Sequence, residues 1–436
     1  MPDRRYHARV AELFRDTLAP DAIEEVGRRS GLIRRRRMVT GTSLFWALMM
    51  ALGGQRVEYI SDVLRTMNAW QGWALRYKPF WNRLATKAFV AFTEDLFRKL
   101  SRELTKRVMS RTHGNVVAMF SDIRIDDGSS FAVADGLKRV FPGRFTKVKP
   151  AAVELHAHMS VMSDQLLSVS LAPDKEAERK FLPPPHALPR RSLSLRDRGY
   201  VDLEYFAQLD EAEAYLICRA KRDINPTIVE VLDGLPRRLR RRWIGRPLDA
   251  LRAKKLRQNL DLLVAWQRPD GTALTLRLCV RYVPEKRSWT WLLTNLPHAM
   301  VDAEAVGQLY RLRWQIELLF KDWKSYANLH AFQTQHASIA EGFIWASLCA
   351  ALLKRSLVHW AQLCSPTLGR VSTRLAAISG PQLMPLLAAW AMTGFPENGR
   401  AALLYFIANN TMRAHPNRDR GTPLWLLGLR PLAARA

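Results

Sequence analysis

Short apolar segments between residues 115 and 219 constrain the fold of this chain more than any other feature. Each is short and apolar, and several alternate, as β-strands do. They are Val116–Phe120, Ala151–Met162, Leu166–Leu171, Leu193–Leu195 and Tyr215–Arg219. The last two flank a helical segment, Leu203–Leu209, which makes a strand-helix-strand unit. Strands followed by such a unit are typical of a mixed α/β domain, so we expect an α/β core here.

The segments on either side have different patterns. Phe89, Phe92 and Leu96 recur at helical spacing, and the C-terminal part of the chain is also mostly helical. Between them, three strand-like runs (Leu262–Trp266, Ala273–Val283 and Ser288–Leu293) are separated by turn residues. The expected organisation is a helical region over 1–110, the first part of the core over 111–222, a β-rich basic insertion over 223–300, a core helix over 301–345 and a helical region over 346–436.

The charge of the chain indicates a polyanionic partner. Lysine and arginine number 67 against 40 aspartates and glutamates, a formal net charge of +27, and nucleic acid is the first candidate. Residues 237–257 hold ten of these cations and one acid. We expect phosphate contacts from this segment and from the end of the strand at 215–219, at Arg237, Arg238, Arg240, Arg241, Arg242, Arg219 and Lys221.

Cysteine usage and hydropathy narrow the class of protein. The four cysteines lie far apart without a CxxC pair, which argues against a zinc ribbon or a disulfide scaffold and fits a reducing cytosol. The longest apolar runs, Ser43–Leu52 and Gly342–Leu353, are shorter than the ~20 residues that cross a bilayer. We therefore expect buried helices and a cytoplasmic protein.

One predicted helix carries two separate faces. Tyr310, Arg313, Glu317 and Lys324 fall within an arc of roughly 60°, while the apolar residues of the helix form their own stripe. A single carboxylate thus lies among cations on the polar face. An ordinary surface helix with ion pairs four residues apart has the same appearance.

Two further acidic motifs follow strand-like runs. Asp197-Arg198-Gly199-Tyr200 comes after Leu193–Leu195, and Asp126-Asp127-Gly128-Ser129-Ser130 comes after Val116–Phe120. Each is also compatible with a turn or a helix cap. Carboxylate oxygens are the ligands that Mg²⁺ prefers, and paired Mg²⁺ ions support in-line phosphoryl displacement. Three acids in so basic a chain favour a metal-dependent nuclease or strand-transfer enzyme.

These motifs together resemble a known family. Tyr310-x2-Arg313-x3-Glu317-x6-Lys324 is similar to the Y-R-E-K signature of the insertion sequence four family of DDE transposases. The DRGY motif at Asp197 resembles the second-aspartate motif of that family. Cys218-Arg219-Ala220-Lys221 and Thr294-Asn295-Leu296-Pro297 are similar too. The resemblance covers about residues 115–345.

The resemblance implies a fold and an activity. The implied fold is α/β, with an RNase H-like catalytic core, a β-rich insertion, and flanking helical N- and C-terminal regions. The implied activity is Mg²⁺-dependent cutting at transposon ends and joining to target DNA, in which Mn²⁺ substitutes for Mg²⁺. The implied assembly is a homodimer that bridges two ends in a synaptic complex. The N-terminal helices are our candidate for binding those ends.

The resemblance also implies roles for individual residues. Asp127, Asp197 and Glu317 would bind the metals, and Tyr310, Arg313 and Lys324 would hold DNA phosphates. Asp127 fits the first-acid motif because glycine and serine follow it, although Asp126 and Asp122 are alternatives. A strand through this point would place Asp126 and Asp127 on opposite faces, so only one of the two would be a ligand.

Two further pairs of residues each share one face of a predicted strand. Trp289 and Trp291 share one face of a predicted strand, where they either stack a flipped DNA base, as in hairpin-forming relatives, or belong to the core. His156 and His158 also share a face, together with Glu154, and HxH is able to bind zinc. The other functions considered are a zinc hydrolase, an RNase H-like nuclease without strand transfer, and a catalytically inactive DNA-binding derivative.

Overall fold

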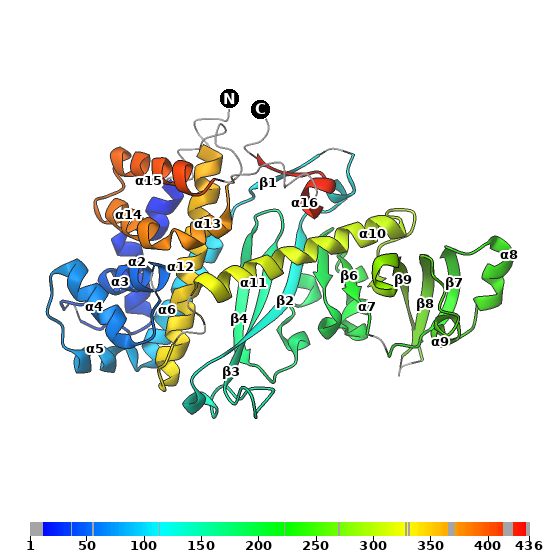
Figure 1. Ribbon diagram of the computed structural model, residues 1–436, viewed down its shortest axis with the longest axis horizontal. Coiled ribbons are helices and arrows are strands. Elements are labelled where there is room, and N and C mark those ends of the chain that lie inside the picture. The colour runs from blue at the N-terminus through cyan, green and yellow to red at the C-terminus, as the bar shows by residue number, and fades with distance from the viewer. Residues whose placement is uncertain are drawn as a thin grey trace.

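A nine-stranded mixed sheet and a helical body make up the computed structural model (Figure 1). The structure describes residues 12–35, 37–54, 56–112, 114–221, 223–268, 271–327, 329, 332–364, 371–412 and 422–432. The order of the strands in the sheet is β4-β3-β2-β5-β6-β10-β9-β8-β7. Their bounds are β2 Ile123–Ala132, β3 Ala152–Ser160, β4 Gln165–Pro173, β5 Leu193–Arg196, β6 Tyr215–Arg219, β7 Thr227–Asp233, β8 Leu260–Gln267, β9 Ala273–Val283 and β10 Ser288–Thr294.

Strand direction divides this sheet into two parts. β2 pairs in parallel with β5, and β5 with β6, whereas β3 pairs in antiparallel register with both β2 and β4. β10 then joins β6 in antiparallel register, and β9, β8 and β7 continue outward from it. The strands of residues 227–294 therefore extend the first five strands as one continuous sheet. A separate pair, β1 (Met109–Arg111) and β11 (Leu429–Pro431), lies outside it.

Helices from both ends of the chain form one helical body. α12 packs against α3 and α6, and α14 packs against α3, because α3 and α12 are apolar on nearly all sides. The helices of this body are α2 Pro20–Arg29, α3 Gly41–Gly54, α4 Ile60–Gln71, α5 Tyr77–Leu84, α6 Lys87–Leu104, α12 Ala337–Cys364, α13 Thr373–Ile378, α14 Gly380–Met392 and α15 Glu397–Asn410. The boundary expected at residue 345 is wrong, since α12 runs through it without a break.

Helix α12 is long and apolar enough to cross a membrane. It has 28 residues, but 83% of its most apolar 18-residue stretch is buried inside the protein. A buried helix at the centre of a helical body accounts for that composition without a bilayer.

The remaining helices cover the sheet and its edge. α10 (Ala303–Tyr310) and α11 (Trp314–Tyr326) cross the front of the sheet in Figure 1, joined by a 3-10 turn at Arg311–Arg313. α7 (Leu203–Glu211) connects β5 to β6. Three short helices are α8 Arg237–Arg240, α9 Leu248–Arg252 and α16 Pro423–Leu426.

The expected elements differ from the structure in two places near the site. Val116–Phe120 is not a strand, because residues Val116–Met119 form a 3-10 turn. The acidic motif Asp126-Asp127 lies inside strand β2 and not in a turn after a strand. A five-residue apolar run is too short for its periodicity to separate a turn of helix from a strand.

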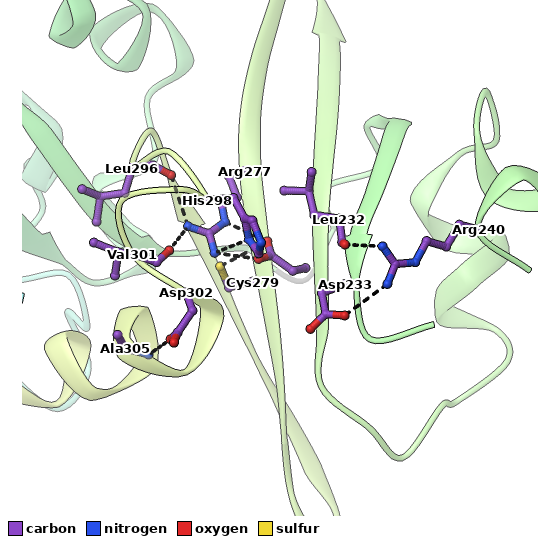
Figure 2. Close-up of polar contacts among 11 residues, drawn as sticks. Leu232, Asp233, Arg240, Arg277, Cys279, Leu296, His298, Val301, Asp302 and Ala305 are labelled. Carbon is purple, nitrogen blue, oxygen red and sulfur yellow. Dashed lines mark hydrogen bonds and ion pairs between the residues drawn. The ribbon is translucent and has the colours of Figure 1, made fainter. Parts of the chain in front are cut away.

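A buried ion pair fixes the loop that leads into α10. Arg277 on β9 binds Asp261 on β8 through two contacts of 2.8 and 2.6 Å, with both side chains buried (Figure 2). The same guanidinium donates to the carbonyl oxygens of Leu296 and Val301, at 3.3 and 2.6 Å. Asp302 then caps α10 by accepting a hydrogen bond from the amide of Ala305. The start of the α10–α11 segment is therefore set by strands β8 and β9.

A buried lysine fixes the other end of that segment. Lys354 of α12 is 2% exposed and donates to the carbonyl oxygens of Gly53, Tyr326 and Ala377, at 3.0, 3.3 and 3.2 Å. These oxygens lie near the C-termini of α3, α11 and α13, where helices leave carbonyls unpaired. Burial lowers the pKa of Lys354 to about 8, although Asp322 opposes the shift.

This lowered pKa predicts a pH-dependent stability. Between pH 8 and about 10.5 the unfolded chain holds a proton on Lys354 that the folded chain has lost, so the free energy of unfolding rises with pH. We expect the wild type to gain up to about 3 kcal/mol over that window relative to Lys354→Met. Chemical denaturation at several pH values measures the difference. Lys321→Met, on the exposed side of α11, is the control, and a constant difference between wild type and Lys354→Met would contradict the assignment.

Candidate active site

Strand β2 presents Asp127 to the face of the sheet that α11 covers. Ile125, two residues earlier and on the same face, is fully buried in the core that includes Ile316 of α11. Asp127 Oδ2 accepts a hydrogen bond from Arg313 Nη1 at 2.7 Å. The first candidate acid is therefore in direct contact with the segment that carries the Y-R-E-K signature.

Strand β5 places Asp197 beside it. β5 runs parallel to β2, and Asp197 directly follows its last residue. The hydroxyl of Tyr310 lies 3.4 Å from Asp197 Oδ1, and Arg219 Nη1 at the end of β6 lies 3.9 Å from the same oxygen. Parallel strands end at one edge of a sheet, which brings the DRGY motif and Arg219 together.

Gly199 of that motif packs against the end of the Glu178 side chain. A Cβ at Gly199 would lie 1.8 Å from Glu178 Oε2. Glu178 belongs to a 3-10 turn before β5, and burial, together with the charge of Asp197, raises its pKa despite the opposing charge of Arg144. Sequence reasoning missed Glu178, because it lies outside any periodic segment.

Arg313 joins the first and third acids. Its Nη1 contacts Asp127, and its Nη2 donates to Oε1 of Glu317, four residues further along. The side chains of Arg313, Asp127 and Glu317 are all partly or largely buried. The structure thus brings Asp127, Asp197 and Glu317 around one cluster, with Arg313 and Tyr310 between them.

Burial gives Asp127 an unusual proton affinity. Burial raises the pKa of Asp127 to about 7, and the charges of Asp197 and Glu178 add to this, while Arg313 opposes it. Burial lowers the pKa of the Arg313 guanidinium, but the carboxylates of Asp127 and Glu317 more than offset it. The cluster holds more negative charge than one guanidinium neutralises, so a further cation would stabilise it.

The donor set fits a hard divalent cation. Three carboxylates from separate elements supply oxygen ligands of the kind Mg²⁺ prefers. Among the described residues, no three or more His, Cys, Asp and Glu side chains are already arranged so that they could hold one metal ion. Arg313 lies between two of the acids and must release them before both face one ion.

The alternative first acids have structural partners instead. Asp126 faces the opposite side of the sheet, where Arg196 Nε lies 2.6 Å and His158 Nδ1 2.8 Å from its carboxylate. Arg196 and Asp126 are both buried, and despite burial Arg196 and His158 hold the pKa of Asp126 well below its usual range. Asp122 accepts from Ser160 Oγ at 2.7 Å.

The two histidines of the HxH pair do not converge on a metal-binding arrangement. His158 contacts Asp126 and the carbonyl oxygen of Phe181. The ring of His156 stacks on Phe181 with centroids 3.8 Å apart, and burial lowers its pKa to about 4. Glu154 lies 3.9 Å from His156 Nε2, and no metal-holding group includes them in the described part of the chain.

The fourth residue of the signature lies apart from the acids. Lys324 is exposed on α11, and burial together with the charge of Lys149 lowers its pKa. Lys149 belongs to the segment between β2 and β3. The two lysines form a basic surface along the direction in which α11 leaves the acids.

A large cavity adjoins Asp197. It has a volume of about 400 Å³, and it is lined by Trp289 and Trp291 of β10 and by cations of four neighbouring segments: Arg198, Arg219, Lys221, Arg252, Lys255 and Arg287. Trp289 Nε1 donates to the carbonyl oxygen of Leu256 at 2.7 Å, and Arg252 lies 5.1 Å from the ring centroid of Trp291. The two tryptophans are half-buried walls of this cavity and not fully buried core residues.

The arginine-rich segment lies at the far edge of the sheet, beside β7. Arg237, Arg238, Arg241 and Arg242 are exposed. Arg240 is used in folding, since its guanidinium donates to the carbonyl oxygen of Leu232 and contacts Asp233 (Figure 2). It also donates to the carbonyl oxygen of Leu235. Between residues 237 and 242, the exposed basic surface is therefore made by the other four arginines.

Comparison with known proteins identifies the family. The family described as "Transposase DDE domain" matches residues 119–353, more than half of the chain. The transposase for insertion sequence element IS231B of Bacillus thuringiensis subsp. berliner is 23% identical over 371 residues, covering 77% of each protein. That for IS231F of Bacillus thuringiensis subsp. israelensis is 25% identical over 383 residues, covering 79% of this chain and 78% of the relative.

A solved structure gives a weaker match. The match to the cryo-EM structure of a piggyBac transposase synaptic complex with hairpin DNA covers 95% of this chain and 86% of that chain, with a TM-score of 0.47 and 11% identity.

The family match spans all three candidate acids, the DRGY motif and the Y-R-E-K helix. The chain therefore belongs to the DDE transposases, in the insertion sequence four family, and is a DNA transposase.

Proposed function

We propose that this DNA transposase cuts at transposon ends and joins them to target DNA, with Asp127, Asp197 and Glu317 as its catalytic carboxylates. The observation that carries the proposal is the contact of Arg313 with both Asp127 and Glu317, beside the Tyr310–Asp197 contact. Acids that are far apart in sequence thus share one cluster on one face of the sheet. Asp126 is set aside as a metal ligand because it faces the other side of the sheet, where the buried Arg196 and His158 bind it.

We also propose that β2–β6 with α7 and α11 form an RNase H-like core and that β7–β10 are its insertion. The order β4-β3-β2-β5-β6, in which three antiparallel strands are followed by two parallel ones, supports this interpretation. The helical body then flanks the core, and its N-terminal helices are the candidate for binding DNA ends. We propose a homodimer acting on DNA in the bacterial cytoplasm.

The residues of the site have distinct tasks in this mechanism. Two bound Mg²⁺ or Mn²⁺ ions would supply Lewis-acid stabilisation of the attacking and leaving oxygens. Asp127, Asp197 and Glu317 would hold them, while the Tyr310 hydroxyl and Arg219 orient Asp197. Arg313, once it releases the acids, presents a planar fork to a DNA phosphate, and Lys324 adds a point charge. The chemistry needs no serine or tyrosine nucleophile.

A cleavage and joining assay tests the function. Purified protein with Mg²⁺ or Mn²⁺ and a plasmid carrying the element's ends should give both cut ends and joined products. Cut ends without joined products would indicate a nuclease that lacks strand transfer. DNA binding with neither product would indicate an inactive derivative, and either result contradicts the proposal.

The cavity beside Asp197 predicts a role for Trp291. We propose that it stacks a flipped DNA base, a contribution of about 1–3 kcal/mol per base. Trp291→Ala should therefore slow formation of hairpin or end-processed products by roughly 5- to 100-fold, while the protein stays folded. Tyr405→Ala, at an exposed tyrosine of α15, controls for loss of an aromatic ring. Normal product formation by Trp291→Ala would remove this residue from the site.

The exposed arginines beside β7 predict a salt effect. Replacing Arg237, Arg238, Arg241 and Arg242 with Gln should weaken binding to all DNA sequences alike. The slope of log K against log salt should become shallower by roughly 0.9 for each phosphate that the protein no longer neutralises. Filter binding between 50 and 200 mM salt, about the range where phosphate neutralisation dominates, measures this slope. Arg190→Gln and Arg374→Gln, at two exposed arginines outside the N-terminal helices, are the control for charge removal. An unchanged slope in the four-arginine variant would exclude its arginines from DNA binding.

A further inference from the structure

A second hollow with aromatic walls lies on the helical body, away from the carboxylates. It has a volume of about 360 Å³ and lies between the start of α4, helix α5 and the segment that leads into α12. Its walls include three aromatic residues, two amides and a histidine: Tyr59, Tyr77, Trp81, Gln333, Gln335 and His336. None of these residues contributes to the site described above.

The aromatic residues of this hollow are unusually open to solvent. Tyr59 is 56% exposed and Tyr77 is 49% exposed, although large aromatic rings gain most from burial. Trp81 is half-buried, with the edge of its ring against His336 at a centroid distance of 5.4 Å. The Lys78 ammonium lies 4.5 Å from the Trp81 ring centroid. Flat exposed faces beside a cation suit a flat ligand that carries negative charge.

Polar side chains line the hollow beside the aromatic rings. His336 is one of them, but its Nδ1 is shielded from solvent and has no hydrogen-bond partner within the described residues, so a ligand would meet the rest of the ring. Gln333 and Gln335 are exposed, and side-chain amides pair with the edges of nucleobases.

The charge around the hollow selects a nucleotide over an apolar segment. Arg76 and Lys78 are exposed cations in the segments that form its walls. Arg56 is exposed too, but it is paired with the carboxylate of Glu58 at 2.9 Å, so these two charges offset each other. An apolar peptide or a second copy of this basic chain would meet uncompensated positive charge here.

The walls of the hollow contact two other parts of the protein. Gln335 packs on Gly136 in the segment after β2, where a Cβ would lie 1.8 Å from Gln335 Oε1. The amide of Gln333 donates to the carbonyl oxygen of Glu58 at 3.0 Å, which joins the same wall to the N-terminal helices. The hollow therefore lies close to the segment that follows the strand carrying Asp127.

We propose that this hollow binds one unstacked nucleotide of the DNA, with its base against Tyr59, Tyr77 and Trp81 and its phosphate near Lys78. The inference rests on the proposed function, which supplies DNA as the ligand, and adds a second anchoring point to it. The base stacks on the rings, the amides and His336 meet its edge, and the cations meet its backbone. Stacking of this kind tolerates any base, so the site anchors DNA without selecting a sequence.

The test uses a labelled oligothymidine and fluorescence anisotropy, without divalent metal and at elevated salt, which suppresses binding through phosphates alone. The background is Trp291→Ala, so that the cavity beside Asp197 does not mask the signal. We expect Tyr59→Ala with Tyr77→Ala to raise Kd by roughly 10- to 100-fold and to leave the salt slope unchanged. The Tyr→Phe pair should restore binding, and Lys78→Gln should reduce the salt slope.

Tyr405→Ala, at a tyrosine 75% exposed on α15, is the matched control and should leave Kd unchanged. A Kd unaffected by the double alanine variant, or a weakening that phenylalanine does not restore, would overturn the nucleotide site. Oligothymidine binding that depends on this hollow, in a protein that neither cuts nor joins DNA, would contradict the proposed function and leave the site standing.

Discussion

Glu317→Gln should reduce DNA cleavage by on the order of 10³-fold or more, as loss of a catalytic carboxylate does elsewhere. Glutamine keeps the shape of the side chain but removes the charge that would hold a divalent cation. Binding to transposon ends should remain near the wild-type level, because other residues bind the phosphates. Arg313 keeps its contact with Asp127 in this variant, and the Glu317 side chain is partly exposed, so the variant should stay folded.

Plasmid cutting and gel-shift assays on the same preparation separate these two effects. Glu304→Gln, an exposed glutamate on α10, is the control for charge removal near the same helix. Cutting by Glu317→Gln at the wild-type rate would show that the third acid lies elsewhere.

Adjacent aspartates on β2 should respond in opposite ways to the same substitution. Asp127→Asn should abolish cleavage and leave the unfolding midpoint within a few degrees of the wild type, because its carboxylate is disfavoured by burial. Asp126→Asn should destabilise the fold by about 3–5 kcal/mol, since it leaves the buried Arg196 guanidinium without its countercharge.

Thermal unfolding and plasmid cutting on both variants measure this contrast, and each variant is the control for the other. A stable, inactive Asp126→Asn protein beside an active Asp127→Asn protein would mean that Asp126, and not Asp127, is the first acid. If both variants were stable and active, neither aspartate would be the first acid.

The sequence predicted the core strands where alternation was clear. β6 and β9 lie at the predicted residues, and β3, β4 and β5 differ by one or two residues at their ends. β7 was not predicted, and its pairing with β8 explains why. Register shifts between Ile228 and Glu230 and between Val231 and Asp233 break the two-residue period that marks a strand.

The sequence predicted the residues of the candidate site, but it did not predict the contacts between them. Spacing alone placed Tyr310, Arg313 and Glu317 on one helical face, although a 3-10 turn interrupts the helix. Strand alternation required Asp126 and Asp127 to face opposite sides. Which side holds the acid cluster depends on Arg196, whose place beside Asp126 follows from the pairing of β5 with β2. Such pairing is a tertiary feature that no local pattern encodes.

The continuous pairing of β10 with β6 has a mechanical consequence. Because β7 to β10 belong to the same sheet as β2 and β5, no flexible hinge separates the outer arginines from the acids within the described strands. Torque applied by DNA at the outer edge would pass through successive backbone ladders and change the twist of the whole sheet. If the outer arginines bind DNA as proposed, the stiffness of the sheet would couple their DNA contacts to the positions of Asp127 and Asp197.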